Sequence, residues 1–435
     1  MFQRSSLRIV LITVVAFLLV SCNRSKGPGA SPATDPALGT LKVVRFANLP
    51  YADHTYSSIG VAKGWFKEVG IDLRPQTIKI EQVVPSLSDG SFDVASVPPG
   101  ILFSSYDTAP NLCTFVFGDL FQGYAIMAQP DKGYKSYSQL RQAGMSHADA
   151  VRKVVQQMKG KTFAYPAESA IKPFIDILFE QGGMRRSEVK ALVLDDPLTV
   201  VSMRTKRADF EVGGVPSRIT LQKEGFIPII SSVDLAKGAR PSPNSMELGS
   251  ILENGWAMRK DLYRSDPATA LRLASVNYRI MKFMGTNPSE AMTIHMAYLS
   301  KVTGQKFTVD DGKVIYDSLD PFVTFESQCS WFHDPNDPLY YANVNGAILQ
   351  SFISDKIYRG ATPTVGDVIY ADATYRELER LKAASDDLFA KLAGKTSLPA
   401  DASSELADAK RFYDDYDFYD SDRLAAAAWQ AVGGK

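Results

Sequence analysis

Aromatic and ionisable side chains lie close together in the segment LPYADHTY, in the loop that follows the chain's first predicted strand. Tyr51 and Tyr56 are suited to stacking on a planar ligand, while Asp53 and His54 are suited to hydrogen bonding with its amines or hydroxyls. A simpler role suits the same segment, in which Asp53 or Ser57 only caps the next helix. The segment therefore indicates either a binding loop or a helix start.

Two further segments share an order of residues that is typical of a strand ending at a helix start. DVASVPPGIL at 93–102 and DFEVGGVPSRI at 209–219 each give an aspartate, an apolar run, and then proline or glycine. Proline is tolerated in the first turn of a helix, and glycine lets a ligand approach the backbone closely. Free N–H groups at a helix start bind anionic or carbonyl oxygens. We therefore predict that the two segments form opposite walls of one site.

A third loop, YPAESAIKPF, precedes another predicted helix, which must begin within one turn of Pro173. Ser169 is most simply the N-cap of that helix, and the alternative is that its hydroxyl or backbone contacts the ligand. Besides the four side chains of LPYADHTY, the predicted ligand contacts are Val97, Pro98, Pro99, Glu168, Ser169, Ala170, Gly214, Val215, Pro216 and Trp256.

Strands and helices alternate along the chain in the βαβ rhythm of a parallel sheet, which predicts an α/β fold. A first series covers residues 41–128, a polar and helix-prone stretch follows at 132–157, and a second series begins at residue 162. The strand-like segments YAIMAQ and NGWAM connect the two series, so we expect two lobes that close about a hinge. Ligands of such sheets bind outside the carboxyl ends of the strands, where the segments above lie.

The amino terminus predicts export and lipidation. Arg4 and Arg8 precede an uninterrupted apolar run at 9–20, which is too short to span a bilayer and fits the core of a signal peptide. The run ends in LVSC, which resembles a bacterial lipobox, so Cys22 is the predicted lipidated first residue of the mature protein; an uncleaved anchor is the alternative. The next residues are rich in Gly, Pro, Ser and Ala and predict a flexible tether.

Composition excludes several classes of function. The formal net charge is +0 and no Lys/Arg-rich block is present, so nucleic-acid binding is not expected. The chain carries no GxSxG, Walker A, CxxC, HExxH or GxGxxG motif, and its four histidines show no helical metal-ligand spacing. We therefore expect no enzyme activity, no cofactor and no metal. A disulfide between Cys113 and Cys329 is left open.

The segment IGVAKGWFKEVGIDL resembles a signature of the solute-binding proteins of ABC importers, in the group that takes nitrate, sulfonates, taurine and thiamine precursors. GSFDVAS, MKGKTFAYPAES and the stretch that begins NGWAMRKDLY are similar to further motifs of that group, in the same order over residues 41–291. The resemblance implies a type II-like periplasmic-binding-protein fold with two crossing hinge strands. Pyrimidine synthases resemble the same fold, but their cysteine-rich motif is absent from this sequence.

The predicted layout combines these signals. A signal peptide at 1–22 and a tether at 23–40 precede a discontinuous first lobe at 41–128 and 250–360, a second lobe at 129–249, and a helical extension at 361–435. The long link at 132–157 and the extension depart from the group's pattern. The extension is predicted either as a helical layer on the first lobe or as a docking surface for a protein.

The predicted function is that of a monomeric, lipid-anchored protein of the periplasm or cell surface, which captures a small organic nutrient and delivers it to an ABC permease. The cleft loops lack the arginine fork expected for a strong dianion. A pyrimidine thiamine precursor is therefore favoured, followed by an alkanesulfonate or taurine, and then by nitrate or bicarbonate. The alternative is a sensory or assembly lipoprotein that uses the extension to bind a partner.

Overall fold

Two five-stranded mixed sheets form the centre of the protein, whose computed structural model describes residues 40–434 apart from 168, 239–245 and 396. The first sheet has the strand order β2–β1–β3–β10–β4, and the second has the order β7–β6–β8–β5–β9. The first sheet contains β1 (Lys42–Asn48), β2 (Ile71–Thr77), β3 (Val94–Val97), β4 (Leu112–Phe121) and β10 (Leu252–Arg259). The second contains β5 (Ala125–Ala128), β6 (Thr162–Tyr165), β7 (Lys190–Val193), β8 (Phe210–Glu211) and β9 (Ile227–Ser231).

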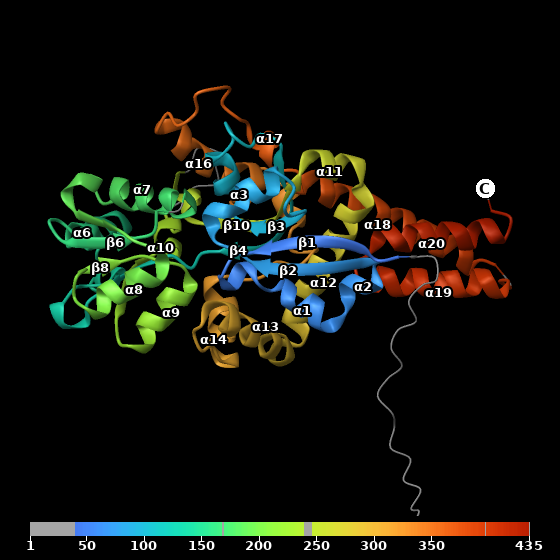
Figure 1. The fold of residues 1–435 in the computed structure, drawn as a ribbon, viewed down its shortest axis with the longest axis horizontal. Helices are drawn as coiled ribbons and strands as arrows, with labels where there is room; N and C mark the ends of the chain where they lie inside the picture. The colour runs from blue at the N-terminus through green and yellow to red at the C-terminus, as the bar shows by residue number, and fades with distance from the viewer. Residues whose placement is uncertain (1–39, 168, 239–245, 396, 435) are drawn as a thin grey trace, which may run out of the picture.

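The two sheets have the same topology. In the first, β1 runs parallel to β2 and β3, and β10 is antiparallel to both β3 and β4. In the second, β6 runs parallel to β7 and β8, and β5 is antiparallel to both β8 and β9. We call each sheet with its covering helices a lobe; Figure 1 shows the second lobe at the left and the first in the middle. The predicted α/β fold with two lobes is confirmed.

The chain passes between the lobes at two places that lie close together. β4 of the first sheet leads through residues 122–124 into β5 of the second, and β10 brings the chain back into the first sheet. β4 and β10 pair side by side, with an irregular register at Asn254/Gly255 and at Trp256/Ala257. Glycine is required at 255, because a Cβ there would overlap the carbonyl oxygen of Val116. The two crossing hinge strands are thus adjacent.

The first lobe is covered by helices whose ends follow local sequence signals. The segment 57–70 has the apolar periodicity of one helix, but it is divided at Gly64, whose φ of 78° is a left-handed conformation that favours glycine. The helical segments are η2 (Ala52–His54), α1 (Ser57–Lys63), α2 (Trp65–Glu68), α3 (Ile80–Ser88), α4 (Pro99–Ser104), α11 (Lys260–Ser265), α12 (Pro267–Thr286), α13 (Pro288–Thr303), α14 (Val309–Val314), η7 (Ile315–Leu319), α15 (Cys329–His333), α16 (Tyr341–Ser354) and α17 (Val365–Val368).

The second lobe has shorter helices on both faces of its sheet. In α6 the buried residues Ala150, Val151, Val154 and Val155 recur at intervals of three and four, which gives this helix one apolar face toward the core. The helical segments are η3 (Pro130–Lys132), α5 (Tyr137–Gln142), α6 (His147–Gln156), η4 (Ser169–Ile171), α7 (Lys172–Gln181), η5 (Arg186–Glu188), α8 (Asp196–Arg204), α9 (Val215–Lys223), α10 (Ser232–Ala236) and η6 (Met246–Ser250).

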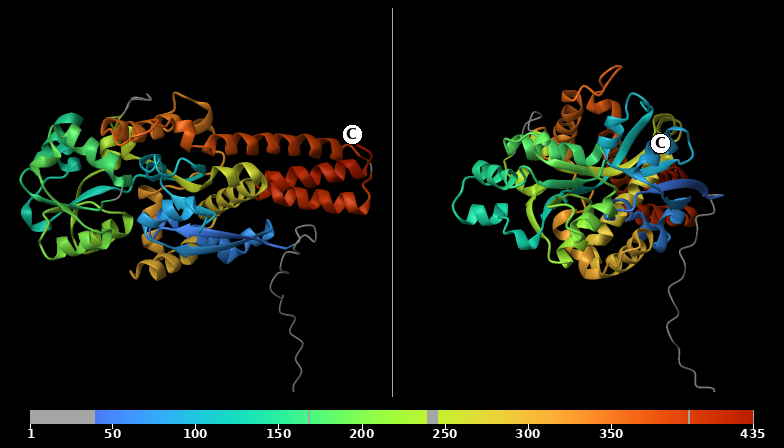
Figure 2. Two further views of the ribbon diagram at one scale, coloured as in Figure 1. Left: turned by 45° about the horizontal axis from the view of Figure 1, so that its top comes forward. Right: turned by 60° about the vertical axis from the view of Figure 1, so that its left-hand side comes forward.

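The last three helices form a C-terminal arm, which consists of α18 (Ala371–Ala393), α19 (Ala400–Asp414) and α20 (Phe418–Ala431). One end of the arm packs on the first lobe, where α18 contacts β4 and α12. The other end projects away from both lobes (Figure 2) and has a small core of its own around Leu392, Ala402 and Ala428. The extra helices that the sequence predicted are therefore present, as a layer that continues into a projection.

Two further features bear on the sequence predictions. Cys113 is a buried free thiol and Cys329 an exposed one, so the two cysteines are not joined. Among the residues that the structure describes, no helix has the length and apolarity needed to cross a membrane. The signal peptide with Cys22, the tether up to residue 39, and Glu168 lie outside the described residues.

Candidate functional site

A cavity lies between the lobes at the ends of their strands. It leaves about 20 Å³ for the centre of a water molecule, which is room for about one water. The lining residues come from the first lobe, from both crossings and from the second lobe: Tyr51, Asp53, His54, Ile80, Pro98, Phe121, Tyr124, Ala170, Gly214, Val215 and Leu252. The lobes are therefore nearly closed upon each other.

Seven of the predicted ligand contacts line this cavity: Tyr51, Asp53, His54, Pro98, Ala170, Gly214 and Val215. The two strand endings singled out in the sequence line this cavity from different lobes, because Pro98 follows β3 of the first lobe and Gly214 precedes α9 of the second. They also occupy equivalent positions, since β3 and β8 are each the third strand of their sheet. The cavity thus brings together predicted residues from four separate segments of the sequence, at 51–54, 98, 170 and 214–215.

Other predicted contacts lie elsewhere. Trp256 is fully buried in the first-lobe core, where its ring stacks on Tyr56 at 5.9 Å between ring centroids and meets Phe46 edge to face. Tyr56 is therefore a core residue too, which corrects the expectation that it stacks on a ligand. Val97, Pro99 and Pro216 are buried beside the lining residues without being part of the lining.

Ser169 is not the N-cap that the sequence suggested. The N-cap of α7 is Ile171, because Ser169 to Ile171 form the separate short helix η4. The Ser169 hydroxyl instead accepts a hydrogen bond of 2.8 Å from the hydroxyl of Ser104 on the first lobe. Ser169 therefore joins the two lobes at the edge of the cleft.

Sequence reasoning missed four lining residues, Ile80, Phe121, Tyr124 and Leu252. Phe121 and Tyr124 flank the outgoing crossing, and Leu252 begins the returning strand β10. The sequence could have indicated these three residues, because they lie in or next to the two segments that are predicted to connect the lobes as a hinge. Ile80 carries no such signal, since it is one more apolar residue at a helix start.

The first-lobe wall is organised around Asp53 and His54. The Asp53 carboxylate accepts a hydrogen bond of 2.6 Å from the side-chain amide of Asn254 and lies 3.2 Å from His54 Nε2. His54 Nδ1 lies 2.9 Å from the hydroxyl of Ser96 on β3. Burial lowers the pKa of His54 to about 3, so the imidazole is neutral. Asp53 is therefore the carboxyl group of the cavity lining, and its oxygens can accept hydrogen bonds.

The second-lobe wall is fixed by a buried aspartate that the sequence did not reveal. Asp196 accepts hydrogen bonds of 3.0 Å each from the backbone N–H of Gly214 and the hydroxyl of Ser217. Glycine is required at 213, because a Cβ there would overlap Asp196 Oδ1. Burial raises the pKa of Asp196 to about 6, against the opposing effect of its two donors. The Gly214 N–H at the start of α9 is thus already hydrogen-bonded to a carboxylate.

Behind the first-lobe wall, Asp53 meets two more acids, Asp119 and Asp320. One carboxylate oxygen of each lies within 4.8 Å of the others, and all three residues are buried. Burial, and then the neighbouring negative charges, raise the pKa of Asp119 far above its usual value, while burial raises the pKa of Asp320 to about 7. None of the oxygens of Asp119 or Asp320 has a hydrogen-bond partner. We call these residues the first-lobe aspartate group.

Polar contacts hold the lobes together on both sides of the cavity. Lys223 on α9 forms an ion pair of 2.7 Å with Asp311 on α14, and nearby the Thr220 hydroxyl donates to Gln305 at 2.7 Å. On the other side, Lys172 on α7 pairs with Asp355 at 2.7 Å, just after α16. These contacts join elements of different lobes, so they stabilise the closed arrangement.

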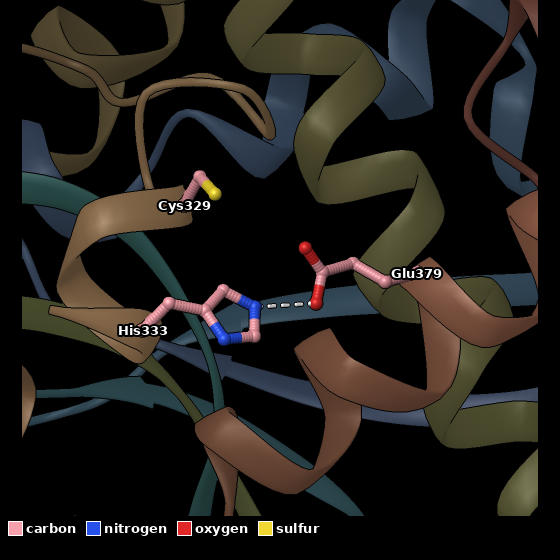
Figure 3. Close-up of side chains that lie close together, drawn as sticks. All are labelled: Cys329, His333 and Glu379. Atoms are coloured by element: carbon pink, nitrogen blue, oxygen red, sulfur yellow. Dashed lines mark hydrogen bonds and ion pairs between the residues drawn. The ribbon is translucent and has the colours of Figure 1, made fainter.

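A second group of metal-ligand types lies at the base of the C-terminal arm (Figure 3). Cys329 and His333 share one face of α15, and Glu379 approaches them from α18. His333 Nε2 lies 2.7 Å from Glu379 Oε2, and Arg376 donates to His333 Nδ1 at 3.0 Å. Because Nδ1 accepts, the proton sits on Nε2 and points at Glu379, which leaves neither ring nitrogen free for a metal. The geometry favours a hydrogen-bonded link between α15 and the arm.

Comparisons with known proteins show the fold. A scan against models of protein families gave no match, and a search of curated proteins gave none either. Among solved structures, the chain is similar to the periplasmic nitrate-binding protein NrtA of Synechocystis PCC 6803, with a TM-score of 0.56, 15% identity, and coverage of 78% of this chain and 88% of that chain. It is also similar to the periplasmic aliphatic sulphonate-binding protein SsuA of Escherichia coli, with a TM-score of 0.54, 10% identity, and coverage of 77% and 100%.

A third similar structure is the alkanesulfonate-binding protein SsuA of Xanthomonas axonopodis pv. citri, bound to MOPS, with a TM-score of 0.50, 10% identity, and coverage of 76% of this chain and 99% of that chain. The predicted periplasmic-binding-protein fold is therefore confirmed. At these identities the likeness shows the fold alone, and the function follows from the site.

Proposed function

We propose that the protein is an extracytoplasmic solute-binding protein, which closes its two lobes on a small organic solute and delivers it to an ABC permease. The observation that carries this proposal is the cavity, whose lining comes from the strand ends of both lobes. Tyr51 of the first lobe faces Gly214 of the second so closely that a Cβ at 214 would lie 3.0 Å from the Tyr51 ring. A solute held by both walls stabilises the closed state, because it makes all its contacts only there.

The charges of the walls favour a neutral or cationic solute over an anion. Asp53 is an acid, His54 is neutral, and no lysine or arginine is present among the lining residues. The helix start on the opposite wall has its Gly214 N–H bound to Asp196, so this N–H group is not available to a sulfonate or nitrate. A buried carboxylate beside a ligand anion is unfavourable. The site therefore supports a solute that donates hydrogen bonds.

The remaining lining favours a planar solute. Tyr51, Phe121 and Tyr124 provide aromatic surface from the loop before α1 and from the outgoing crossing. Aromatic faces contribute dispersion and stacking energy to flat rings, and a carboxylate accepts from exocyclic amines. An amino-heterocycle such as a pyrimidine thiamine precursor matches the chemistry of this lining best, and the lobes must part further to admit it, because the cavity has room for about one water. A sulfonate or taurine comes next, because solved structures of the same fold are sulphonate-binding proteins.

The proposed location rests on the amino terminus. Cys22 is the proposed site of lipidation, and residues 23–40 are the proposed tether between the membrane surface and the folded lobes. Replacing Cys22 by Ser is expected to release the protein from membranes into the soluble fraction of the envelope. Retention of Cys22→Ser in membranes would contradict lipid anchoring and favour the uncleaved anchor.

The alternative function, docking of a protein partner through the C-terminal arm, has less support. The exposed large apolar residues of the described chain are Val43, Val61, Val193, Leu198, Val201 and Val314, and none of them lies on the arm. Surfaces that bind proteins usually present a contiguous apolar patch. The arm is therefore better explained as a helical layer of the fold.

A ligand screen tests the proposal. The unfolding temperature of the protein is measured with aminopyrimidines, alkanesulfonates, taurine and nitrate. A ligand at about 100 times its Kd adds about 2.7 kcal/mol to the free energy of unfolding. We expect the largest shift with an aminopyrimidine, and a much smaller shift with the same compound in Asp53→Asn. A shift with alkanesulfonates alone would replace the proposed solute, and no shift with any compound would contradict solute binding.

A further inference from the structure

The first-lobe aspartate group joins four parts of the chain that are distant in sequence. Asp53 lies on η2 at the cavity wall, Asp119 on the crossing strand β4, and Asp320 directly after η7. Their exposed fractions are 5%, 0% and 0%. Asn254 on the returning strand β10 is the direct ladder partner of Asp119 and donates to Asp53. The group therefore sits where both hinge strands meet the cleft.

The charge of this group is not balanced by protein cations. Among the described residues, no lysine or arginine forms an ion pair with Asp119 or Asp320, and His54 beside Asp53 is neutral. Four carboxylate oxygens, those of Asp119 and Asp320, lack any hydrogen-bond partner. Three carboxylates at this spacing in a buried site cannot all be ionised without a positive charge among them. A bound cation or added protons must supply it.

A neutral oxygen beside the group distinguishes these two choices. The side chain of Asn254 is fully buried, and its Oδ1 has no hydrogen-bond donor although its Nδ2 is used. The hydroxyl of Tyr56, which is buried close to the group, is also without a partner. Added protons supply at most one donor per carboxyl, which is fewer than the oxygens of Asp119, Asp320 and Asn254 that lack a partner, whereas one hard cation contacts several carboxylate and amide oxygens at once.

We propose that Asp53, Asp119 and Asp320, together with the side-chain oxygen of Asn254, bind a divalent cation of the hard class, with Ca²⁺ as the best fit. The donor set consists of oxygen alone, which excludes a preference for Zn²⁺ or Cu²⁺. Ca²⁺ is preferred to Mg²⁺ because Ca²⁺ occupies sites made largely of protein oxygens in flexible geometry, whereas Mg²⁺ usually keeps several of its waters. The oxygens of the group lie within 4.8 Å of one another.

The ion would have a defined effect on the protein. It connects the loop that carries Asp53 and His54 to both hinge strands and to the segment after η7. It would therefore hold the first-lobe wall of the cavity in place and stabilise the base of the hinge. This inference does not depend on which solute the cavity binds, because the ion lies behind the cavity wall.

Metal titration of the full-length protein, purified in detergent and stripped with a chelator, tests the proposal. Terbium serves as a luminescent substitute for Ca²⁺, and the rings of Tyr56, Trp256 and Tyr316 lie near enough to the group to sensitise its emission. We expect sensitised terbium emission that Ca²⁺ displaces, and a rise of about 5 °C in the unfolding temperature at Ca²⁺ near 100 times its Kd.

Matched variants place the ion. Asp320→Asn is expected to weaken Ca²⁺ binding at least tenfold and, without metal, to leave the protein as stable as wild type or more so. Asp317→Asn changes an exposed aspartate three residues earlier and should keep both responses. Titration of the wild type decides the matter if Asp320→Asn does not fold: no emission and no shift with Ca²⁺, Mg²⁺ or Mn²⁺ would overturn the proposal. A response to Zn²⁺ alone that Cys329→Ser removes would also overturn it, and would place a metal at α15.

Discussion

Buried carboxylates lie on both sides of the cleft, and the two groups are satisfied in different ways. In the second lobe, Asp196 receives a backbone N–H from Gly214 and a hydroxyl from Ser217. In the first lobe, Asp119 and Asp320 receive no donor, and a third acid, Asp53, is within 4.8 Å of both. Asp53 of the first group and Gly214, whose N–H binds Asp196, line the same cavity, so the fold of the lobes alone does not explain the difference.

The comparison separates a structural carboxylate from one that requires a ligand. Asp196 stabilises the start of α9 through hydrogen bonds that are complete within the protein, and its removal leaves donors without an acceptor. Asp119 and Asp320 repel each other and Asp53, so removing one of them relieves repulsion unless a cation is bound. The same substitution is therefore expected to have opposite effects on stability in the two lobes.

The largest effect is expected from removing the second-lobe acid. Asp196→Ala leaves the buried Gly214 N–H and the Ser217 hydroxyl without their acceptor, which should lower the free energy of unfolding by about 3 kcal/mol. Denaturant unfolding measures this loss, and Asp195→Ala is the control, because Asp195 is exposed and its side chain makes no cap hydrogen bond. If Asp196→Ala and wild type are equally stable, Asp196 does not stabilise the start of α9.

A glycine substitution tests the same wall by a steric route. Gly213→Ala places a Cβ against Asp196 Oδ1, so the carboxylate must leave its position or the strand end must shift. We expect a loss of about 2 kcal/mol, as for other overpacked sites. The control variant is Gly366→Ala, whose added Cβ meets only Thr364 Oγ1 at 4.0 Å. Gly225→Ala is unsuitable as a control, because the φ of 88° at Gly225 would itself strain an alanine. A smaller loss of stability in Gly213→Ala than in Gly366→Ala would show that Asp196 is not held in place.

The pH dependence of stability has opposite signs for two buried groups. His295 is held by Thr55 and Tyr316, and burial lowers its pKa from 6.5 to about 3. The unfolded chain therefore binds a proton that the folded protein excludes, and stability falls as the pH drops below 6.5, by about 2 kcal/mol between pH 6.5 and pH 5. His295→Gln should remove this contribution to the acid limb in denaturant unfolding at several pH values, and it should leave the similar contribution of the buried His54 in place.

The pH dependence of stability that comes from Asp196 has the opposite sign, and it applies between pH 3.8 and pH 6. The folded pKa of Asp196, about 6, lies above the ordinary value of 3.8, so the folded protein binds the extra proton and stability falls as the pH rises from 3.8 through 6. Asp196→Asn should remove this fall while His295→Gln leaves it in place. If both variants keep the pH profile of the wild type, the burial of these groups does not govern their titration.

The smallest effect is expected from the ion pairs between the lobes. Lys223 is half exposed, so Lys223→Ala should change the free energy of unfolding by less than about 1 kcal/mol. It should still favour the open state, because Asp311 belongs to the other lobe, and small-angle scattering should show a larger radius of gyration. Lys206→Ala breaks the pair of 2.7 Å with Asp131 within one lobe and should leave the radius unchanged. Equal radii for both variants would show that the pair does not hold the lobes together.

Much of the fold could be predicted from local sequence. The Pro98–Pro99 and Gly213–Gly214 pairs follow the ends of β3 and β8, which are equivalent strands of the two sheets. Pro98 and Gly214 line the same cavity. Turn and helix-start chemistry is local, so it is visible in a few consecutive residues. The helix break at Gly64 was missed, because the apolar periodicity continues through it.

The site was only partly predictable, for two physical reasons. Tyr56 and Trp256 look the same in sequence whether they face a ligand or each other, and the structure places them in the core. Asp119 and Asp320 come near Asp53 only through the tertiary fold, so no spacing motif links the three. Long-range contacts of this kind carry no periodicity, and buried carboxylates in particular contradict the usual expectation that acids are exposed.

Calorimetric titration of the best aminopyrimidine from the screen into wild type and Gly214→Val tests the central claim, that a solute binds between the closed lobes. Valine at 214 places its side chain against Tyr51 across the cavity. We predict that Gly214→Val lowers the affinity for the solute at least tenfold, which is about 1.4 kcal/mol. Without ligand, the variant protein should unfold at nearly the same temperature as wild type. Equal affinities of the two proteins would place the solute outside the cleft and contradict the account.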